Sequence, residues 1–234
     1  MPVLGGPNPP ASLALHRDWF FTQGANAQAV YDFGPLLSNG VRGSTTGADT
    51  TQDFTWNAGG WAAFDGTSDY GTATTTLLGA NNSFTLMALI RLTTGIDRKA
   101  VTIGSATGAS LNSIGLGSSG SNVRVVIFGG DIITTHPLGT GWKLLTFRFA
   151  ARNVTGYAGI TEIANTTLGA DLALPANPIV HFGKPTWTLA EYWGGDVARV
   201  LLYNAQLTVA QLTEEVNRVS IEMRERGFTS ADFI

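Results

Sequence analysis

The chain has 234 residues, of which 44% are hydrophobic and 13% are charged, and its formal net charge is −3. This length suits one large all-β domain, and the charged fraction is about half of the usual ~25%. The negative charge and the lack of any basic run argue against a nucleic-acid partner, and the absence of cysteine excludes disulfides and thiolate metal ligands.

The first segment, residues 1–11, contains four prolines and two glycines. Such a segment forms neither a helix nor a central strand. It is either a disordered end or an extended arm that lies on a neighbouring subunit. Because it has no basic region followed by an apolar one, it does not resemble a signal peptide. No apolar run approaches the roughly 20 residues that span a bilayer, so we expect no membrane partner.

Short strand signals follow along the chain, separated by loops that carry Gly or Pro. Residues 60–64 are apolar and run into Asp65 and Gly66, a dipeptide typical of a hairpin turn. Residues 83–92 alternate apolar and other side chains with a period of two, which indicates a strand. Further strands are predicted at 100–103, 113–116, 123–128, 142–149, 155–160, 179–182 and 197–203. The pattern predicts two antiparallel sheets packed as a sandwich over residues 12–207.

One helix is predicted at the C-terminal end, within a segment 208–234 that packs on the same domain. Thr208 and Gln211 form a T-x-x-Q capping box, and Gly227 suits the position just after the helix. The apolar residues between them repeat at helical spacing and form one stripe: Leu212, Val216, Val219 and Met223.

Two passages together carry a family resemblance. The first joins 63–70 (AFDGTSDY) to 82–90 (NSFTLMALI), and the second is 194–208 (GGDVARVLLYNAQLT), directly before the predicted helix. In order and distance they resemble the concanavalin A-like lectin/glucanase superfamily, in particular its laminin G-like jelly-roll domains. The resemblance covers roughly residues 13–215 and implies a jelly-roll sandwich. In it Phe64 and Phe84 would lie in the core and Tyr203 would pack beneath the helix.

Carboxylates are the first test for catalysis. Glucanases of this superfamily carry two or three carboxylates at alternate positions of one strand, and retaining hydrolysis needs two carboxyls ~5 Å apart. No such run occurs here, because the glutamates are scattered. The three histidines lack metal-ligand spacing, and no G-x-S-x-G motif marks a nucleophile. We therefore expect no enzyme, no catalytic residue and no cofactor.

Calcium is the one ion that the resemblance suggests, because some related domains hold Ca²⁺ through Asp, Asn and loop carbonyls. Asp65, Asp69 and Asp196 are the candidate ligands by motif position. Capping of turns is the alternative role for these side chains.

Aromatic residues precede the last predicted strand in the segment WTLAEYW, residues 187–193. Loop aromatics can stack on the faces of sugars, so Trp187, Tyr192 and Trp193 are the candidate glycan-binding residues. Packing in the core is the alternative for them.

These features predict a non-catalytic structural and recognition protein of an assembled particle, in particular a phage virion component such as a decoration, head-fibre or tail-associated protein. The reasons are a lectin-like domain without an export signal, the Pro-rich arm, low charge and the apolar end Phe233–Ile234. The expected partners are further copies, other virion proteins and surface glycans, and the expected location is the virion after synthesis in the cytoplasm. A free carbohydrate-binding lectin is the alternative, and a divergent glycan-cleaving enzyme is a third hypothesis.

Overall fold

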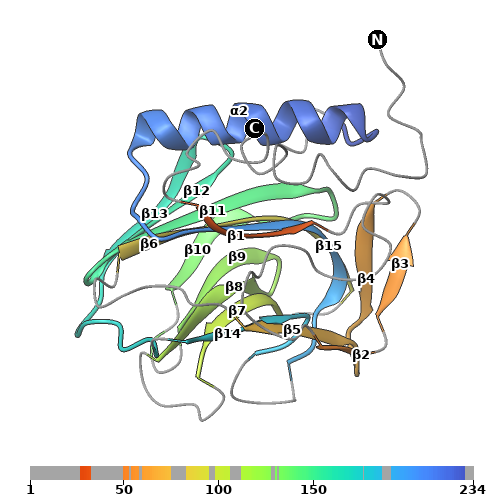
Figure 1. The fold of residues 1–234 in the computed structure, drawn as a ribbon, viewed down its shortest axis with the longest axis horizontal. Helices are drawn as coiled ribbons and strands as arrows, with labels where there is room; N and C mark the ends of the chain where they lie inside the picture. Colours follow the sequence, from red (N-terminus) through yellow and green to blue (C-terminus); the bar gives the residue numbers. More distant parts are fainter. Residues whose placement is uncertain are drawn as a thin grey trace, which may run out of the picture.

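The chain forms two antiparallel sheets and a C-terminal helix in a computed structural model (Figure 1). The structure describes residues 27–32, 50–52, 54–57, 60–74, 83–94, 98–105, 112–127, 130, 132–175, 177–185 and 191–229. The predicted arm at 1–11 and the last five residues, 230–234, lie outside this described part.

The first sheet has eight strands and the second has seven, and every pairing between neighbours is antiparallel. The eight-stranded order is β13 (Thr161–Thr167), β12 (Asn153–Ala158), β11 (Lys143–Ala150), β6 (Ser83–Thr94), β15 (Gly194–Tyr203), β4 (Trp61–Asp65) and β3 (Thr55–Asn57), with β1 (Ala27–Asp32) also paired to β15. The seven-stranded order is β10 (Ile132–Pro137), β9 (Asn122–Ile127), β8 (Ser113–Ser119), β7 (Lys99–Gly104), β14 (Ile179–Phe182), β5 (Tyr70–Thr74) and β2 (Thr50–Gln52). These sheets confirm the predicted jelly-roll sandwich.

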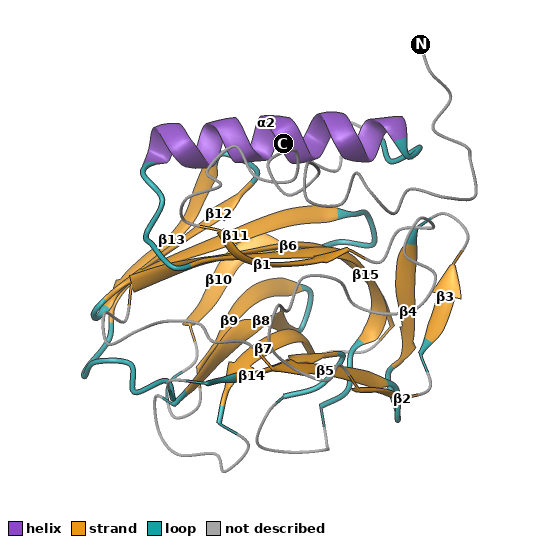
Figure 2. Cartoon of the chain, viewed as in Figure 1, coloured by secondary structure: helices purple, strands orange, loops and turns teal. Residues whose placement is uncertain are grey.

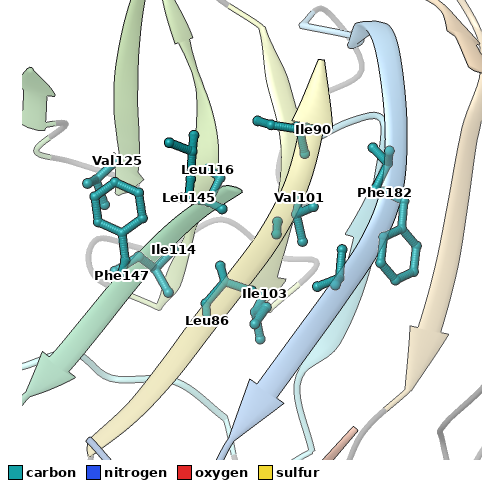
Figure 3. Packing of buried hydrophobic residues seen from close by; sticks show 14 of the residues in the cluster. Leu86, Ile90, Val101, Ile103, Ile114, Leu116, Val125, Leu145, Phe147 and Phe182 are labelled. Carbon is teal, nitrogen blue, oxygen red and sulfur yellow. The ribbon is translucent and has the colours of Figure 1, made fainter. Parts of the chain in front are cut away.

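The main core lies between the two sheets, where alternate residues of each strand point inward. Leu86 and Ile90 of β6 and Phe147 of β11 face the second sheet from one side, and Val101 and Ile103 of β7 face them from the other (Figure 3). All five side chains are fully buried. The predicted core residues Phe64 and Phe84 belong to the same cluster, which confirms their expected role.

A second core lies on the opposite face of the eight-stranded sheet, beneath helix α2 (Val209–Glu225). The helix crosses the outside of this sheet as a third layer (Figure 2). Met87 and Leu89 alternate with the inward residues of β6 and are buried against it. In β15 a register shift between Val197 and Arg199 changes the alternation. As a result, Arg199 faces the helix.

Helix α2 begins and ends as the sequence predicts. Thr208 and Gln211 form both hydrogen bonds of the capping box, and Gly227 follows the helix with a positive φ of 92°. The predicted stripe is buried, and the Tyr203 hydroxyl beneath it donates to Glu215 at 3.0 Å. No helix among the described residues combines the length and the apolar character needed to cross a membrane.

The predicted hairpin at Asp65 and Gly66 is wrong. Strand β4 before the turn lies in the eight-stranded sheet, whereas β5 after it lies in the seven-stranded sheet. The segment 65–69 therefore carries the chain from one sheet to the other. Strands β10 and β13 were not predicted from the sequence. Both are edge strands with exposed polar positions, so their sequences show little alternation of apolar residues.

Truncation of a buried helix residue tests whether α2 is part of the core. Leu212→Ala should lower the free energy of unfolding by about 2–5 kcal/mol, because Leu212 is 1% exposed beneath the helix. Urea denaturation measures the change. Ile221→Ala is the control, since Ile221 on the same helix is 54% exposed and should change stability by less than about 0.5 kcal/mol. Equal, small effects of both variants would contradict a core role for the helix.

Candidate functional site

The Asp65 carboxylate organises the turn between the two sheets. It accepts backbone hydrogen bonds from Thr67 at 2.8 Å, Ser68 at 2.9 Å and Asp69 at 3.1 Å, together with bonds from the Thr67 and Ser68 hydroxyls. Asp69 in turn accepts from the Asp65 amide at 2.9 Å. Burial raises the pKa of Asp65, but the hydrogen bonds from Ser68 and Thr67 outweigh it and hold that pKa well below its ordinary value.

Asp196 lies in a different environment, on the helix-facing side of the first sheet. Its carboxylate pairs with Arg91, at 2.7 Å from Nε and 2.6 Å from Nη2. The Arg91 guanidinium lies over the Trp61 ring at 5.4 Å and the Trp142 ring at 4.8 Å. Burial raises the pKa of Asp196, and the bond and charge of Arg91 act against that rise.

The C-terminal segment closes this aromatic cluster instead of leaving the domain. The Phe228 ring lies 5.8 Å from that of Trp61 and 4.9 Å from that of Trp142, and Phe228 is buried. Arg226 donates to the backbone oxygen of Gly60 at 2.7 Å. Phe228 therefore packs on its own domain, whereas the apolar end Phe233–Ile234 lies outside the described residues.

The residues predicted to bind calcium do not fit a shared ion. Both oxygens of Asp65 accept hydrogen bonds within its turn, and Asp196 is paired with Arg91. In the described part of the chain, no group of three or more His, Asp or Glu residues is placed to hold a metal ion. The geometry favours the alternative roles of turn capping for Asp65 and ion pairing for Asp196.

The three predicted glycan-binding aromatics have separate positions. Trp187 lies outside the described residues. Trp193 is completely buried in the core between the sheets, so neither face of its ring is open to a sugar, and core packing is its role in this structure. Tyr192 is half-buried and forms a parallel bridge with Lys99 at the start of β7.

A row of polar residues crosses the outer face of the seven-stranded sheet. Thr72 of β5 pairs in register with His181 of β14, and His181 pairs with Thr102 of β7. Residues opposite each other in register share a face, so these three form a row across the sheet. Their neighbours Val180 and Phe182 belong to the main core, which places the row on the outer side.

Lys184 lies beside this row, just after β14. The Gly183 amide donates to the Ala100 oxygen at 2.8 Å, and Thr102 Oγ1 donates to the Lys184 oxygen at 3.1 Å. These bonds hold the segment over the sheet. The Lys184 ammonium lies 3.4 Å from the centre of the Tyr70 ring, and the residue is 7% exposed.

A second buried lysine lies on a connected segment. Lys99 is 1% exposed and pairs with Glu191, whose carboxylate lies 2.5 Å from its Nζ. Glu191 lies two residues before Trp193, whose amide donates to the Gly183 oxygen at 2.7 Å. This bond joins the segment that carries Glu191 to the segment that carries Lys184. We use the name Lys184 site for Tyr70, Lys99, His181, Lys184, Glu191 and Tyr192.

His181 is the titrating group of this site. Burial and, to a lesser extent, the charge of Lys184 lower its pKa to about 4, against the opposing effect of a hydrogen bond to the Pro185 backbone. The imidazole is therefore neutral at neutral pH and is buried in that form. Neither Lys184 nor His181 was singled out from the sequence, because an isolated lysine and an isolated histidine carry no motif.

Comparisons with known proteins support the fold. No protein family and no curated protein sequence matches the chain. Domain 4 of AbnA, an extracellular arabinanase of Geobacillus stearothermophilus in complex with arabinotriose, is similar in structure with a TM-score of 0.62 and 16% identity, over 81% of this chain and 98% of that one.

Two larger structures contain a similar part. A Trypanosoma rangeli sialidase in complex with sialic acid has a TM-score of 0.63 and 16% identity, over 85% of this chain and 33% of the sialidase. The other is a structure of botulinum neurotoxin type C, whose cell entry depends on interaction with two ganglioside molecules. It has a TM-score of 0.61 and 10% identity, and the match covers 88% of this chain and 52% of the toxin structure. This chain thus spans about a third of the sialidase and about half of the toxin structure. At these identities the likeness shows the fold alone.

The buried neutral His181 should make stability depend on pH. The unfolded state binds a proton near the ordinary pKa of 6.5, whereas the folded state does so only near about 4. Unfolding free energy should therefore fall as the pH decreases from 6.5 to 4, by on the order of 2–3 kcal/mol. His181→Asn should remove most of this decline in urea titrations at several pH values. His136→Asn is the comparison, because burial and the charge of Lys143 lower the pKa of the partly exposed His136 less strongly, and this variant should remove much less of the decline. An unchanged decline in the His181 variant would contradict this explanation.

Proposed function

We propose that the chain is a non-catalytic recognition domain that binds a glycan at the Lys184 site. The observation that carries the proposal lies on the outer face of the seven-stranded sheet, where the Lys184 ammonium lies over the half-buried Tyr70 ring and close to His181. The half-buried Tyr192 belongs to the segment that the Trp193 amide joins to Gly183. Sugars offer apolar ring faces and hydroxyl groups together. Aromatic rings next to hydrogen-bonding groups suit both.

The division between the two sheets supports this location. Helix α2 covers the outer face of the eight-stranded sheet, and no helix in the described ranges covers the corresponding face of the other sheet (Figure 2). Structures with this fold include a domain in complex with arabinotriose and a toxin that interacts with gangliosides. We carry glycan recognition over from them as part of the proposal.

The positions of the carboxylates support a non-catalytic role. Hydrolysis of a glycan needs two cooperating carboxyl groups, one of which donates a proton and has a raised pKa. The pKa of Asp65 is instead below its ordinary value, Asp196 is held by Arg91, and Glu191 is held by Lys99. These carboxylates have structural partners on different parts of the domain.

Glycan binding to variants of the two tyrosines tests the proposal. Tyr70→Ala and Tyr192→Ala should each weaken binding to an array of immobilised glycans, by about tenfold in affinity, because truncation of an aromatic contact typically costs more than 1 kcal/mol. Isothermal calorimetry on the best glycan of the array gives the dissociation constants. Ile221→Ala, on the far side of the domain, should bind like the wild type. Full binding by both tyrosine variants would rule out this surface as the site.

Membership of an assembled particle stays a prediction from the sequence, and with it location in a phage virion and self-association. We propose it as the setting in which recognition takes place, with the Pro-rich segment 1–11 as the attachment element. Proline-rich chain cannot satisfy its own backbone groups in regular structure, so it gains from lying on another surface.

Sedimentation velocity tests this setting. The full-length chain should associate with itself or with purified phage particles, and a variant without residues 1–11 should remain folded but associate less. A variant without residues 230–234, which keeps the buried Phe228, separates the contribution of the two ends. A monomer that never associates with particles, yet binds glycans equally well when trimmed, would establish the free-lectin alternative.

A further inference from the structure

The two buried lysines of the Lys184 site differ in how their charge is balanced. Lys99 is 1% exposed and has the Glu191 carboxylate 2.5 Å from its ammonium. Lys184 is 7% exposed, and within the described part of the chain no carboxylate forms an ion pair with it. Its neighbours are the ring of Tyr70 and the imidazole of His181, which shares its sign when protonated.

An ammonium that is partly desolvated and lacks an anion is costly, because burial of the side chain removes part of its water and returns only the weaker attraction of an aromatic ring. The pKa of Lys184 is lowered by this burial. A domain that needed only packing at this position would be more stable with an apolar side chain. The absence of an anion beside Lys184 among the described residues is therefore the feature that indicates an anionic ligand.

His181 offers the site a second group for a ligand. Its Nδ1 is buried and has no hydrogen-bond partner among the described residues. In the neutral imidazole, the bond to the Pro185 backbone uses the ring N–H, so Nδ1 remains as an acceptor. A hydroxyl group is the natural donor to it. An anionic group for Lys184 and a hydroxyl for His181 occur together in an acidic sugar.

We propose that the Lys184 site binds an acidic sugar, with Lys184 pairing with its anionic substituent. This inference rests on the proposed glycan recognition and specifies the class of glycan. Lys184 supplies a compact point charge, which suits a carboxylate or a sulfate on a ring. Tyr70 lies against the ammonium, and Tyr192, on the segment joined to Gly183, is the second aromatic residue of the site.

The test compares matched glycans and matched lysine variants. An array of neutral, carboxylated and sulfated glycans on common scaffolds is probed first, and calorimetry then compares the best anionic glycan with its neutral counterpart. Lys184→Met should lower the affinity for the anionic glycan about tenfold or more, because it removes a hydrogen bond to a charged group. The affinity for the neutral glycan should change by less than about twofold. Lys143→Met, which removes one of the other described lysines from β11, should change neither.

Stability separates a ligand-binding lysine from a structural one. Lys184→Met should melt at the same temperature as the wild type or higher, because it removes an unpaired buried charge, and Lys184→Arg should retain part of the preference for anionic glycans. Lys184→Gln serves as a second neutral variant if the methionine variant does not fold. The carboxylated and sulfated arms of the array identify which anion is bound.

The contrary outcomes are distinct. A wild type that binds only neutral glycans, with binding lost in Tyr70→Ala, would overturn the acidic-sugar inference and leave glycan recognition standing. The same holds if Lys184→Met keeps the full preference for anionic glycans. A wild type that binds no glycan on the array would overturn both proposals.

Discussion

The eight-stranded sheet has to be covered on both faces, and the rest of the molecule depends on that constraint. Antiparallel sheets commonly pack one face on a core and leave the other to water. In this sheet Leu86 and Ile90 point into the sandwich, while Met87 and Leu89 on the same strand point away from it and are equally buried. Each square ångström of such apolar surface contributes about 25 cal/mol when removed from water. Helix α2 is therefore a layer of the core.

Charged residues fix how the helix lies on the sheet. Glu215 is fully buried, accepts from the Tyr203 hydroxyl at 3.0 Å and pairs with Arg218 at 2.6 Å. Arg218 also lies 2.5 Å from Glu222, which is paired with Arg199 of β15. A hydrophobic stripe alone allows a helix to slide or rotate, whereas these directional contacts are satisfied in one arrangement. Their net contribution to stability is small compared with their effect on geometry.

Local sequence signals predicted local structure well. The capping box at Thr208, the end at Gly227 and the buried stripe are properties of neighbouring residues on one helix, and all are found. The sequence also predicted the turn at Asp65 correctly, but it did not predict that the next strand, β5, joins the other sheet. That choice depends on pairing with distant strands, because β5 pairs with β14 and β2. Alternation on residues 83–92 indicated one buried face only, because nothing in that segment shows that a helix more than 100 residues later covers the other.

The candidate site was beyond local signals for the same reason. Tyr70, His181 and Lys184 come together only through the register of β5 with β14 and the fold of the segment after it. The aromatic segment 187–193 drew attention to the correct region, yet its largest described residue, Trp193, proved to be core. The sequence shows that this segment is rich in aromatic residues, but only the packing shows whether each ring lies in the core or on the outer face of the sheet.

The two outer faces of the sandwich differ in how one buried lysine is balanced, because Lys99, beside the polar row of the seven-stranded sheet, is paired with Glu191 whereas Lys184 forms no ion pair with the described residues. Beneath helix α2, Glu215 and Arg199 each have a partner of opposite sign. On the other outer face, Lys184 meets an aromatic ring and a histidine. Sequences generally satisfy packing, charge and hydrogen bonding together, and departures from this consistency concentrate where function is carried out. The charge that the domain leaves unbalanced therefore lies on the face that no described helix covers, where an external anion can balance it.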